Sequence, residues 1–419
     1  MVKDTKFDVA VVGAGPAGII AACTAAKNGA KVVLIEKNKQ LARKLLLTGN
    51  GRCNITNAEF NLRELAKNYN NGEFLFHAFS VFGPKETIKF FEDLGVKTKT
   101  EANKRVFPES NDAEEVLEAL SKCLTEDKVE ILFETEVEDV VFKAKKISKL
   151  VTGEVEITAK NFIISTGGKT YSATGSNGIG YKLAERMGHT IVKPSPALAP
   201  IKIKEEWVKT LRGISLRDMK INVLQDGKKQ FSEEGELVFT DFGISGPSVL
   251  NISGKVGDLM ARGLSAQAGN VKISFDLFPL LNQEQLLGGI EEMINKYARQ
   301  ITKNVLSSFV AERFAEVLLY IAKIDKNKTA SNLSKAERLT LVKTLKNVEI
   351  TPEEVFGFDQ AIATRGGIAL KEIDHKTMKS KLIDNLFFAG EIIDVDGKTG
   401  GFNLQMCWST GRLAGDNFK

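Results

Sequence analysis

Long apolar segments are absent from this chain of 419 residues. No uninterrupted apolar run reaches the roughly 18 residues that a transmembrane helix needs, so we expect no membrane partner. The N-terminal residues also lack the basic start, apolar segment and small-residue cleavage site of a signal peptide. The sequence therefore favours a cytoplasmic protein, and its length favours two or three domains.

Cysteine and histidine are scarce, and no charge sign is in large excess. Four cysteines (Cys23, Cys53, Cys123 and Cys407) lie far apart in the sequence, and there are three histidines. This spacing predicts neither a metal site nor a redox-active dithiol. The 58 basic and 53 acidic residues are spread along the chain, and the net charge of +5 gives little support to nucleic-acid binding. We expect a small-molecule partner and no nucleic acid, and the oligomeric state stays open.

A glycine-rich turn links the first predicted strand to the first predicted helix. The strand is Phe7–Val12, and GAGPAG (residues 13–18) leads into a helix-forming stretch. A G-x-G-x-x-G motif between a strand and a helix is typical of dinucleotide-binding βαβ units. Gly13 makes the tight turn, Gly15 lets the backbone approach a pyrophosphate, and Gly18 permits close packing of the helix on the strand.

An acidic residue follows the second predicted strand. The strand is Lys31–Ile35, and Glu36 comes directly after it. A carboxylate at this position can accept hydrogen bonds from ribose hydroxyls, and it would repel a 2′-phosphate. NADP is therefore a poor candidate, whereas FAD and NAD both stay open on these residues. The structural alternative is a βαβ unit that binds no nucleotide.

Segments far along the chain are expected to complete the same sheet. The strand-like run KNFIIST ends in Thr166-Gly167-Gly168, and a buried strand at Leu386–Gly390 runs into Glu391. The segment TGGFNLQ then reads as a Gly-Gly start of a last helix. The N-terminal unit is thus completed by strands near the other end of the chain, with other material inserted between.

Five motifs follow one another along nearly the whole chain: KLLLTGNGRCNITN, KRVFPESNDAEEVLEAL, GELVFTDFGISGP, ATRGGIALKEID and AGEIIDVDGKTGGFNLQ. With these motifs in this order, residues 7 to 417 resemble the YhiN/BaiN family of bacterial flavoproteins, which has a glutathione-reductase-like FAD domain. The resemblance implies an α/β fold and FAD as the cofactor. Asn50 stands where the family loop is expected to have glycine, and asparagine also tolerates positive φ.

The resemblance also assigns positions along the cofactor. The first glycines hold the pyrophosphate, a strand residue near Val137 meets the adenine, and the late acidic segment holds the ribityl chain. The last helix points its N-terminus at the flavin's pyrimidine edge. The residues expected to contact FAD are Gly13, Gly15, Ala17, Gly18, Glu36, Lys37, Lys44, Thr48, Gly49, Gly51, Arg52, Cys53, Asn54, Val137, Thr166, Gly167, Gly168, Gly390, Glu391, Gly401, Phe402, Asn403 and Leu404.

The loop Thr48–Asn54 is placed by the resemblance beside the isoalloxazine ring. Its glycines would let peptide N–H groups approach flavin N5 and O4, and Arg52 would favour the anionic reduced flavin. The alternative is a solvated turn. Cys53 is interpreted first as a small packed hydrophobe, and second as a flavin contact or a reactive thiol.

The middle of the chain departs from the βαβ pattern. Strand-like runs come first, and helical patterns follow. The predicted fold is therefore a Rossmann-like FAD-binding domain with an inserted β-rich domain that carries a small helical lobe. The predicted boundaries are 1–190 with 350–419 for the FAD domain, 191–280 for the substrate or cap domain, and 281–349 for the lobe. A cap over the cofactor is an analogy with other flavoproteins.

These features predict an FAD-dependent oxidoreductase that transfers a hydride between flavin N5 and a small or apolar substrate. Only one dinucleotide fingerprint is present, so NAD(P)H is expected as a transient reductant without its own domain. The resemblance implies reduction of a conjugated C=C bond; alternatives are amine oxidation with oxygen, or a non-catalytic redox-sensing or accessory flavoprotein. Arg52, Arg365 and Asp394 are the candidate catalytic residues.

Overall fold

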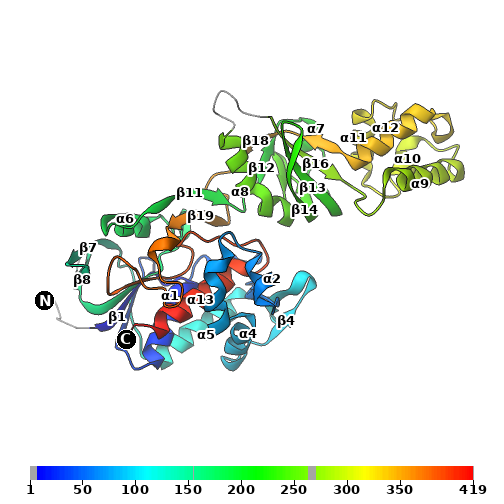
Figure 1. Cartoon of the computed structure of the whole chain (residues 1–419). Helices are drawn as coiled ribbons and strands as arrows, with labels where there is room; N and C mark the ends of the chain where they lie inside the picture. Colours follow the sequence, from blue (N-terminus) through cyan, green and yellow to red (C-terminus); the bar gives the residue numbers. More distant parts are fainter. Residues whose placement is uncertain (1–6, 154, 263–269, 419) are drawn as a thin grey trace. The chain divides into compact units, whose positions relative to one another are not determined.

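The computed structural model describes residues 7–153, 155–262 and 270–418. The chain divides into two compact units, Met1–Ala197 with Phe358–Lys419, and Leu198–Gly357. The first unit is discontinuous, because the second is inserted within it (Figure 1). The three-part division with boundaries at residues 190, 280 and 350 stays a prediction. Within the described residues, no helix combines the length and apolarity that crossing a membrane requires.

A five-stranded parallel sheet forms the centre of the first unit, in the order β20-β10-β1-β2-β6. Its inner strands are rich in buried valine and isoleucine, which is typical of a parallel sheet that is covered on both faces. This sheet confirms the predicted Rossmann-like α/β fold. The strands are β1 (Phe7–Val12), β2 (Val32–Ile35), β6 (Glu130–Leu132), β10 (Ala159–Ile164) and β20 (Leu386–Phe388).

Two helices pack on this sheet, α1 (Pro16–Lys27) and α13 (Phe402–Asp416), and α5 (Ala113–Glu126) packs on α1. The last helix lies directly against the first, as Figure 1 shows in red and blue. Glycine permits this approach, because a Cβ added at Gly411 would lie 2.3 Å from the Ala17 carbonyl oxygen. Helices from the two ends of the chain therefore pack together in one layer of the first unit.

Smaller elements complete the first unit. One sheet has the order β3-β5-β4, another β7-β8-β9, and β11 pairs antiparallel with β19. The bounds are β3 (Thr56–Asn57), β4 (Thr98–Thr100), β5 (Arg105–Pro108), β7 (Val137–Lys143), β8 (Lys146–Thr152), β9 (Glu156–Ile157), β11 (Ile191–Ala197), β19 (Ala363–Ile368), α2 (Leu62–Ala66), α3 (Phe76–Val81), α4 (Pro84–Asp93) and α6 (Ile179–Arg186).

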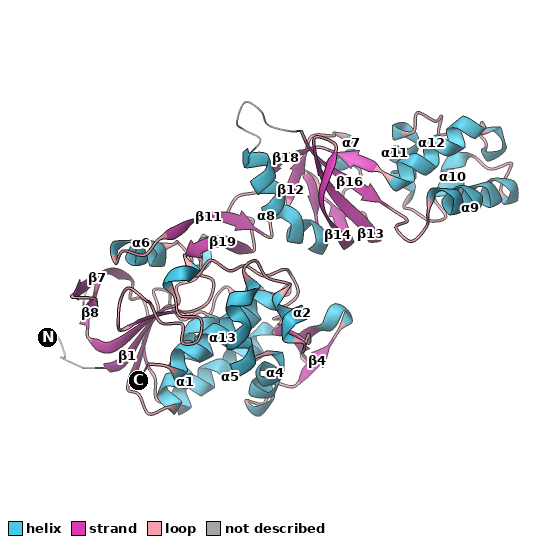
Figure 2. Cartoon of the chain, viewed as in Figure 1, coloured by secondary structure: helices cyan, strands magenta, loops and turns pink. Residues whose placement is uncertain are grey.

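The second unit joins an antiparallel sheet to a helical group, coloured magenta and cyan in Figure 2. Its seven strands have the order β17-β16-β13-β14-β15-β12-β18. Phe239, Phe275 and Phe314 are fully buried in a core that belongs to this unit. The bounds are β12 (Ile201–Ile203), β13 (Ser215–Gln225), β14 (Lys228–Phe239), β15 (Gly243–Ser245), β16 (Val271–Asp276), β17 (Val348–Ile350), β18 (Pro352–Val355), α7 (Trp207–Thr210), α8 (Pro247–Arg262), α9 (Gln283–Lys296), α10 (Thr302–Leu306), α11 (Glu312–Ile321) and α12 (Lys335–Lys346).

Candidate functional site

The glycines after β1 have different structural roles. Gly13 has a φ of +96°, and a Cβ added at Gly18 would lie 1.9 Å from the Gly13 carbonyl oxygen. Both positions therefore require glycine for the packing of α1 on β1. Apart from its two chain neighbours, no described residue has an atom within 4 Å of a Cβ added at Gly15. Since Gly15 is also the N-cap of α1, this glycine leaves open space for a ligand at a helix N-terminus.

Glu36, at the end of β2, is buried and holds the glycine-rich turn. One carboxylate oxygen accepts a hydrogen bond from the Ala14 N–H at 2.9 Å. The other oxygen accepts from the Asn38 N–H at 2.9 Å and from the Asn38 amide at 2.7 Å. This acid therefore organises the turn in addition to the ribose-binding role that the sequence predicts for it.

A cleft with a volume of about 120 Å³ follows the carboxyl ends of β1, β2, β10 and β20. Ligands of open α/β sheets bind at this edge, because the loops there diverge. The hydroxyl oxygen of Thr166, which lines the cleft, is buried without a hydrogen-bond partner among the described residues. The expected FAD contacts that line the cleft are Gly13, Gly15, Ala17, Glu36, Lys37, Lys44, Val137, Thr166, Gly167, Gly390 and Glu391.

Glu391 lies at the centre of a polar network on one wall of the cleft. Lys44 Nζ lies 2.8 Å from Glu391 Oε2 and also donates to the Thr170 hydroxyl at 2.7 Å. The Thr364 N–H donates to Glu391 Oε1 at 2.7 Å. A Cβ added at Gly168 would lie 2.2 Å from the Thr364 hydroxyl oxygen, so this glycine supports the network from outside the cleft lining.

The loop Thr48–Asn54 lies outside the cleft lining. It is tightly wound, since Gly49, Asn50, Gly51 and Cys53 all have φ between +57° and +82°. This conformation favours glycine and asparagine, as the sequence indicates at Asn50. Burial raises the pKa of the Cys53 thiol to about 12, so the thiol is protonated at neutral pH. That protonation state favours a packing role for Cys53.

Arg52 is engaged by neighbouring residues of the first unit. Its guanidinium lies 2.9 Å from a Glu101 carboxylate oxygen and 3.9 Å from the centre of the Phe107 ring. It also donates to the Asn111 side chain at 3.2 Å. The Arg52 charge, which we expect from the sequence to act on the flavin, is therefore already paired with the Glu101 carboxylate.

The start of α13 adjoins this loop. Gly401 has a φ of +95°, and an added Cβ would lie 2.4 Å from the Thr56 carbonyl group. The Asn54 side chain is oriented so that both its amide nitrogen and its amide oxygen have hydrogen-bond partners. In this orientation the amide oxygen accepts a hydrogen bond from the Gly401 N–H at 3.0 Å. Asn403 fixes the preceding turn through 2.9 Å hydrogen bonds with both backbone groups of Gly397. Phe402 and Leu404, also expected contacts, follow on this helix outside the cleft lining.

Arg365 and Asp394 lie close to one further acid, Asp396. Arg365 Nε donates to Asp396 Oδ1 at 3.3 Å. The Asn71 amide donates to the Asp394 carbonyl oxygen at 3.0 Å. Burial, and then the nearby Asp396 charge, raise the pKa of Asp394 to about 6 against the opposing effect of Arg365. A carboxyl group with this pKa can carry a proton close to neutral pH.

Several cleft residues have no place among the sequence predictions. The GSNGIG segment has the wrong order for a dinucleotide fingerprint, yet Gly175 and Ser176 line the cleft. The glycine, serine and asparagine of this segment indicate a turn before α6, and that turn is the sequence signal for a place beside the cleft. Cys407 of α13 also lines the cleft. The other residues that sequence reasoning missed include Asn38, Arg43, Thr135, Glu136, Ser165, Thr174 and Ile179.

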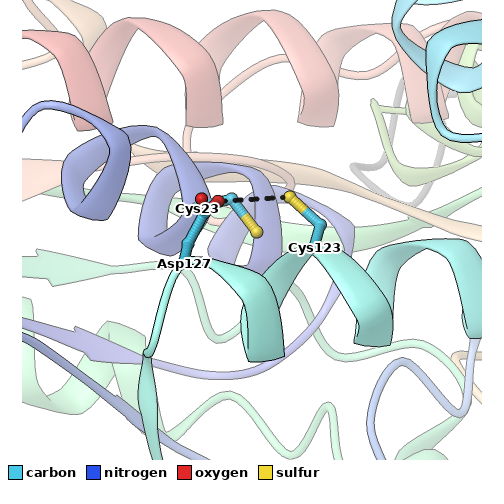
Figure 3. Close-up of side chains that lie close together, drawn as sticks. All are labelled: Cys23, Cys123 and Asp127. Atoms are coloured by element: carbon cyan, nitrogen blue, oxygen red, sulfur yellow. Dashed lines mark hydrogen bonds between the residues drawn. The ribbon is translucent and has the colours of Figure 1, made fainter.

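Two cysteines that are distant in sequence meet in the first unit (Figure 3). Cys23 of α1, Cys123 of α5 and Asp127 have their sulfur and oxygen atoms within 4.8 Å of one another. Cys123 Sγ lies 3.5 Å from Asp127 Oδ2. The interaction of the two thiols raises the pKa of Cys23 and lowers that of Cys123. The sequence spacing gives no sign of this pair, because it is formed by the packing of two helices.

Comparisons with known proteins agree with this architecture. Residues 7–417 match the family model described as HI0933-like protein Rossmann domain. A 3-dehydro-bile acid delta(4,6)-reductase from Clostridium scindens is 33% identical, and the match covers 97% of this chain and 98% of that protein. A ribosomal RNA dihydrouridine synthase from Haemophilus influenzae is 30% identical, over 96% of this chain and 95% of that protein.

Among solved structures, a 3-ketosteroid delta1-dehydrogenase from Sterolibacterium denitrificans shares the fold with a TM-score of 0.54. The match covers 99% of each chain at 12% sequence identity. At this identity, the likeness concerns the fold alone.

Proposed function

This chain belongs to the HI0933-like family, a family of FAD-dependent oxidoreductases, and we propose that it reduces a C=C bond conjugated with a carbonyl group. The observation that carries the cofactor part of the proposal is the open space at Gly15, at the carboxyl edge of the parallel sheet. The names of both relatives support the reaction, since a delta(4,6)-reductase and a dihydrouridine synthase each add hydrogen to a ring C=C bond.

The residues of the cleft fit FAD in the following way. The N–H groups at the start of α1 would meet the pyrophosphate beside Gly15, and Thr166, which lines the cleft, has a buried hydroxyl without a hydrogen-bond partner among the described residues. Glu36 would accept hydrogen bonds from ribose hydroxyls, and Val137 would contact the adenine, since both residues line the cleft. When bound, FAD carries the hydride that is transferred to the substrate carbon.

The loop Thr48–Asn54 and the first residues of α13 flank the flavin ring in this proposal. The Asn54 to Gly401 hydrogen bond keeps these two segments adjacent. Both bring backbone N–H groups to one region, and such groups stabilise negative charge that develops on a polar ring edge. Glu391 and Lys44 fix the neighbouring wall and keep its geometry constant.

Reduction of a conjugated C=C bond adds a hydride to one carbon and a proton to the other. We assign the donation of this proton to Asp394. Because its pKa is raised, a fraction of the protein molecules has a protonated Asp394 carboxyl near neutral pH. Arg365 and Asp396 form a hydrogen bond with each other, and their charges act on the pKa of Asp394 in opposite directions. NAD(P)H supplies the electrons transiently, since the chain has one dinucleotide fingerprint and FAD takes it.

The test is anaerobic stopped-flow reduction of the purified yellow protein by NADH and by NADPH, followed by mixing with a panel of enones. We expect the flavin to be reduced by one nicotinamide and reoxidised by an enone in a single turnover. Flavin that is reduced by amines and reoxidised by oxygen alone would instead support an amine oxidase. Flavin that no reductant or substrate changes would support a non-catalytic accessory protein.

A second candidate substrate is the uracil ring of RNA. The relative from Haemophilus influenzae is named a ribosomal RNA dihydrouridine synthase and matches nearly the whole chain. The prediction that no nucleic acid binds therefore stays a prediction. Dihydrouridine appearing in uridine-containing RNA incubated with protein and NAD(P)H would support this candidate, and its absence beside rapid enone turnover would exclude it.

A further inference from the structure

A second hollow, here called the α2 groove, lies on the first unit and shares no lining residue with the dinucleotide cleft. Its volume is about 910 Å³, within the range of ligand sites. Its lining combines three cationic side chains with aromatic rings and contains one carboxylate. The lining residues are Arg63, Ala66, Lys67, Tyr69, Asn71, Gly72, Glu73, Phe74, Phe76, Leu370 and Lys371.

The charges of the groove favour an anionic ligand. Arg63, Lys67 and Lys371 are exposed on its walls, against Glu73 alone. Lys67 already pairs with Glu64 at 2.7 Å, whereas neither Arg63 nor Lys371 forms an ion pair within the part of the chain that the structure describes. Two cations thus stay available to a bound oxyanion, which arginine can hold in a two-pronged contact.

Apolar surface lies among these cations. The side chain of Phe76 is 36% exposed, and Phe74 and Leu370 are partly exposed beside it. Aromatic rings and cations together recognise a flat or apolar ring that carries an acidic group, because the ring packs on the aromatic face while the charge is neutralised. An inorganic anion would use only the cationic half of this lining.

The groove is attached to the proposed reaction site. Asn71, in its wall, donates to the Asp394 carbonyl oxygen at 3.0 Å. Tyr69, also in the wall, donates its hydroxyl to the Phe402 carbonyl oxygen at 2.8 Å, and the two rings stack edge to face. A ligand in the groove therefore contacts segments that hold the proposed acid and the start of α13.

We propose that the α2 groove binds the anionic end of the substrate, a carboxylate or phosphate joined to an apolar or aromatic ring. This inference rests on the proposed function, because the ring's C=C bond is the group to be reduced. Arg63 and Lys371 bind the oxyanion, and Phe74 and Phe76 pack on the apolar part of the substrate next to it, so that the ring with the C=C bond extends beyond the groove. These residues determine specificity and take no part in hydride or proton transfer.

The test uses the FAD-bound protein and two pairs of probes that differ in charge. One pair is a steroid enone carboxylate and its methyl ester, and the other is uridine monophosphate and uridine. Calorimetric titration should show the charged member of one pair binding about ten- to a hundredfold more tightly than its neutral partner. The pair that discriminates identifies whether the oxyanion is a carboxylate or a phosphate.

Variants then assign the effect to the groove. Arg63→Gln combined with Lys371→Gln should abolish the difference between charged and neutral probes and leave the affinity for the neutral probe unchanged. Lys122→Gln, an exposed lysine on α5, is the matched control and should retain the difference. Raising the salt concentration should weaken the charged probe alone, because exposed charges are screened.

Equal affinity within both pairs, or a difference that survives Arg63→Gln with Lys371→Gln, would overturn the inference. The outcomes also separate it from the proposed function. If enones are reduced equally well whatever the charge of the probe, the groove does not bind the substrate's anionic end, and the proposed reaction is still supported. If the charged probes bind more tightly but none is reduced, the groove is an anion-binding site and the proposed reaction is wrong.

Discussion

Lys44 and Glu391 form an ion pair of 2.8 Å between segments at opposite ends of the chain. Lys44 follows the second strand of the parallel sheet, and Glu391 follows the last. Their side chains are 22% and 13% exposed, so water screens the pair only in part. Glu391 also accepts from the Thr364 N–H, so the pair closes one wall of the cleft.

We expect Lys44→Met to destabilise the protein by about 1–3 kcal/mol, because Glu391 would keep a partly buried charge without its cation. Glu391→Gln should destabilise it similarly through Lys44. Urea unfolding of both single variants and of the double variant measures the coupling between them. Fully additive losses would contradict a direct interaction between the two side chains.

Gly15 and Gly18 should respond differently to substitution. Gly15→Val places its side chain in space where, beyond its chain neighbours, no described residue lies within 4 Å of the Cβ, so the fold should persist while FAD occupancy is lost. Gly18→Ala should instead lower the melting temperature, because its Cβ would lie 1.9 Å from the Gly13 carbonyl oxygen. Circular dichroism and the absorbance of released FAD separate these effects. Full FAD occupancy in Gly15→Val would mean that the turn has only a structural role.

Asp394 should give stability a distinct pH dependence. Burial and Asp396 raise its pKa from an ordinary 3.8 to about 6, so the folded state favours the protonated carboxyl. The resulting stabilisation is complete below the unfolded pKa of 3.8 and is lost as the pH rises through about 6. Asp394→Asn should therefore gain unfolding free energy relative to the parent across this interval, measured by urea unfolding at a series of pH values.

The same group should appear in the pH profile of turnover. Enone reduction should slow as the pH rises above about 6, because the deprotonated Asp394 cannot donate. Asp394→Asn should react slowly with little pH dependence over that range. A parent profile that stays flat between pH 5 and pH 8 would remove Asp394 from the reaction.

Arg52 should influence the flavin less than an unpaired cation would. Its hydrogen bonds lower the pKa of Glu101, which stays ionised and offsets the arginine charge. We expect Arg52→Ala to lower the midpoint potential by less than about 30 mV. Glu101→Gln should raise the potential, because Arg52 is then uncompensated. Redox titration at equal FAD occupancy measures both, and a potential unchanged in Glu101→Gln would place Arg52 away from the ring.

The sequence by itself determined the local parts of this protein. Gly13, Gly15 and Gly18 were identifiable because the turn between strand and helix depends on backbone conformation and on the absence of a Cβ over a few residues. The buried strands were identifiable because their apolar residues are contiguous, and the ordered motifs indicated the family. Asn50 was expected to tolerate positive φ for the same local reason, and it has a φ of +58°.

Only the tertiary structure decided which distant side chains meet. The packing of α1 on α5 brings Cys23 to Cys123, and a loop contact gives Arg52 the carboxylate of Glu101. The α2 groove likewise combines residues near Arg63 with Lys371, which no local pattern relates. Such pairs depend on the path of the whole chain, because side chains on separate elements become neighbours only when the elements pack.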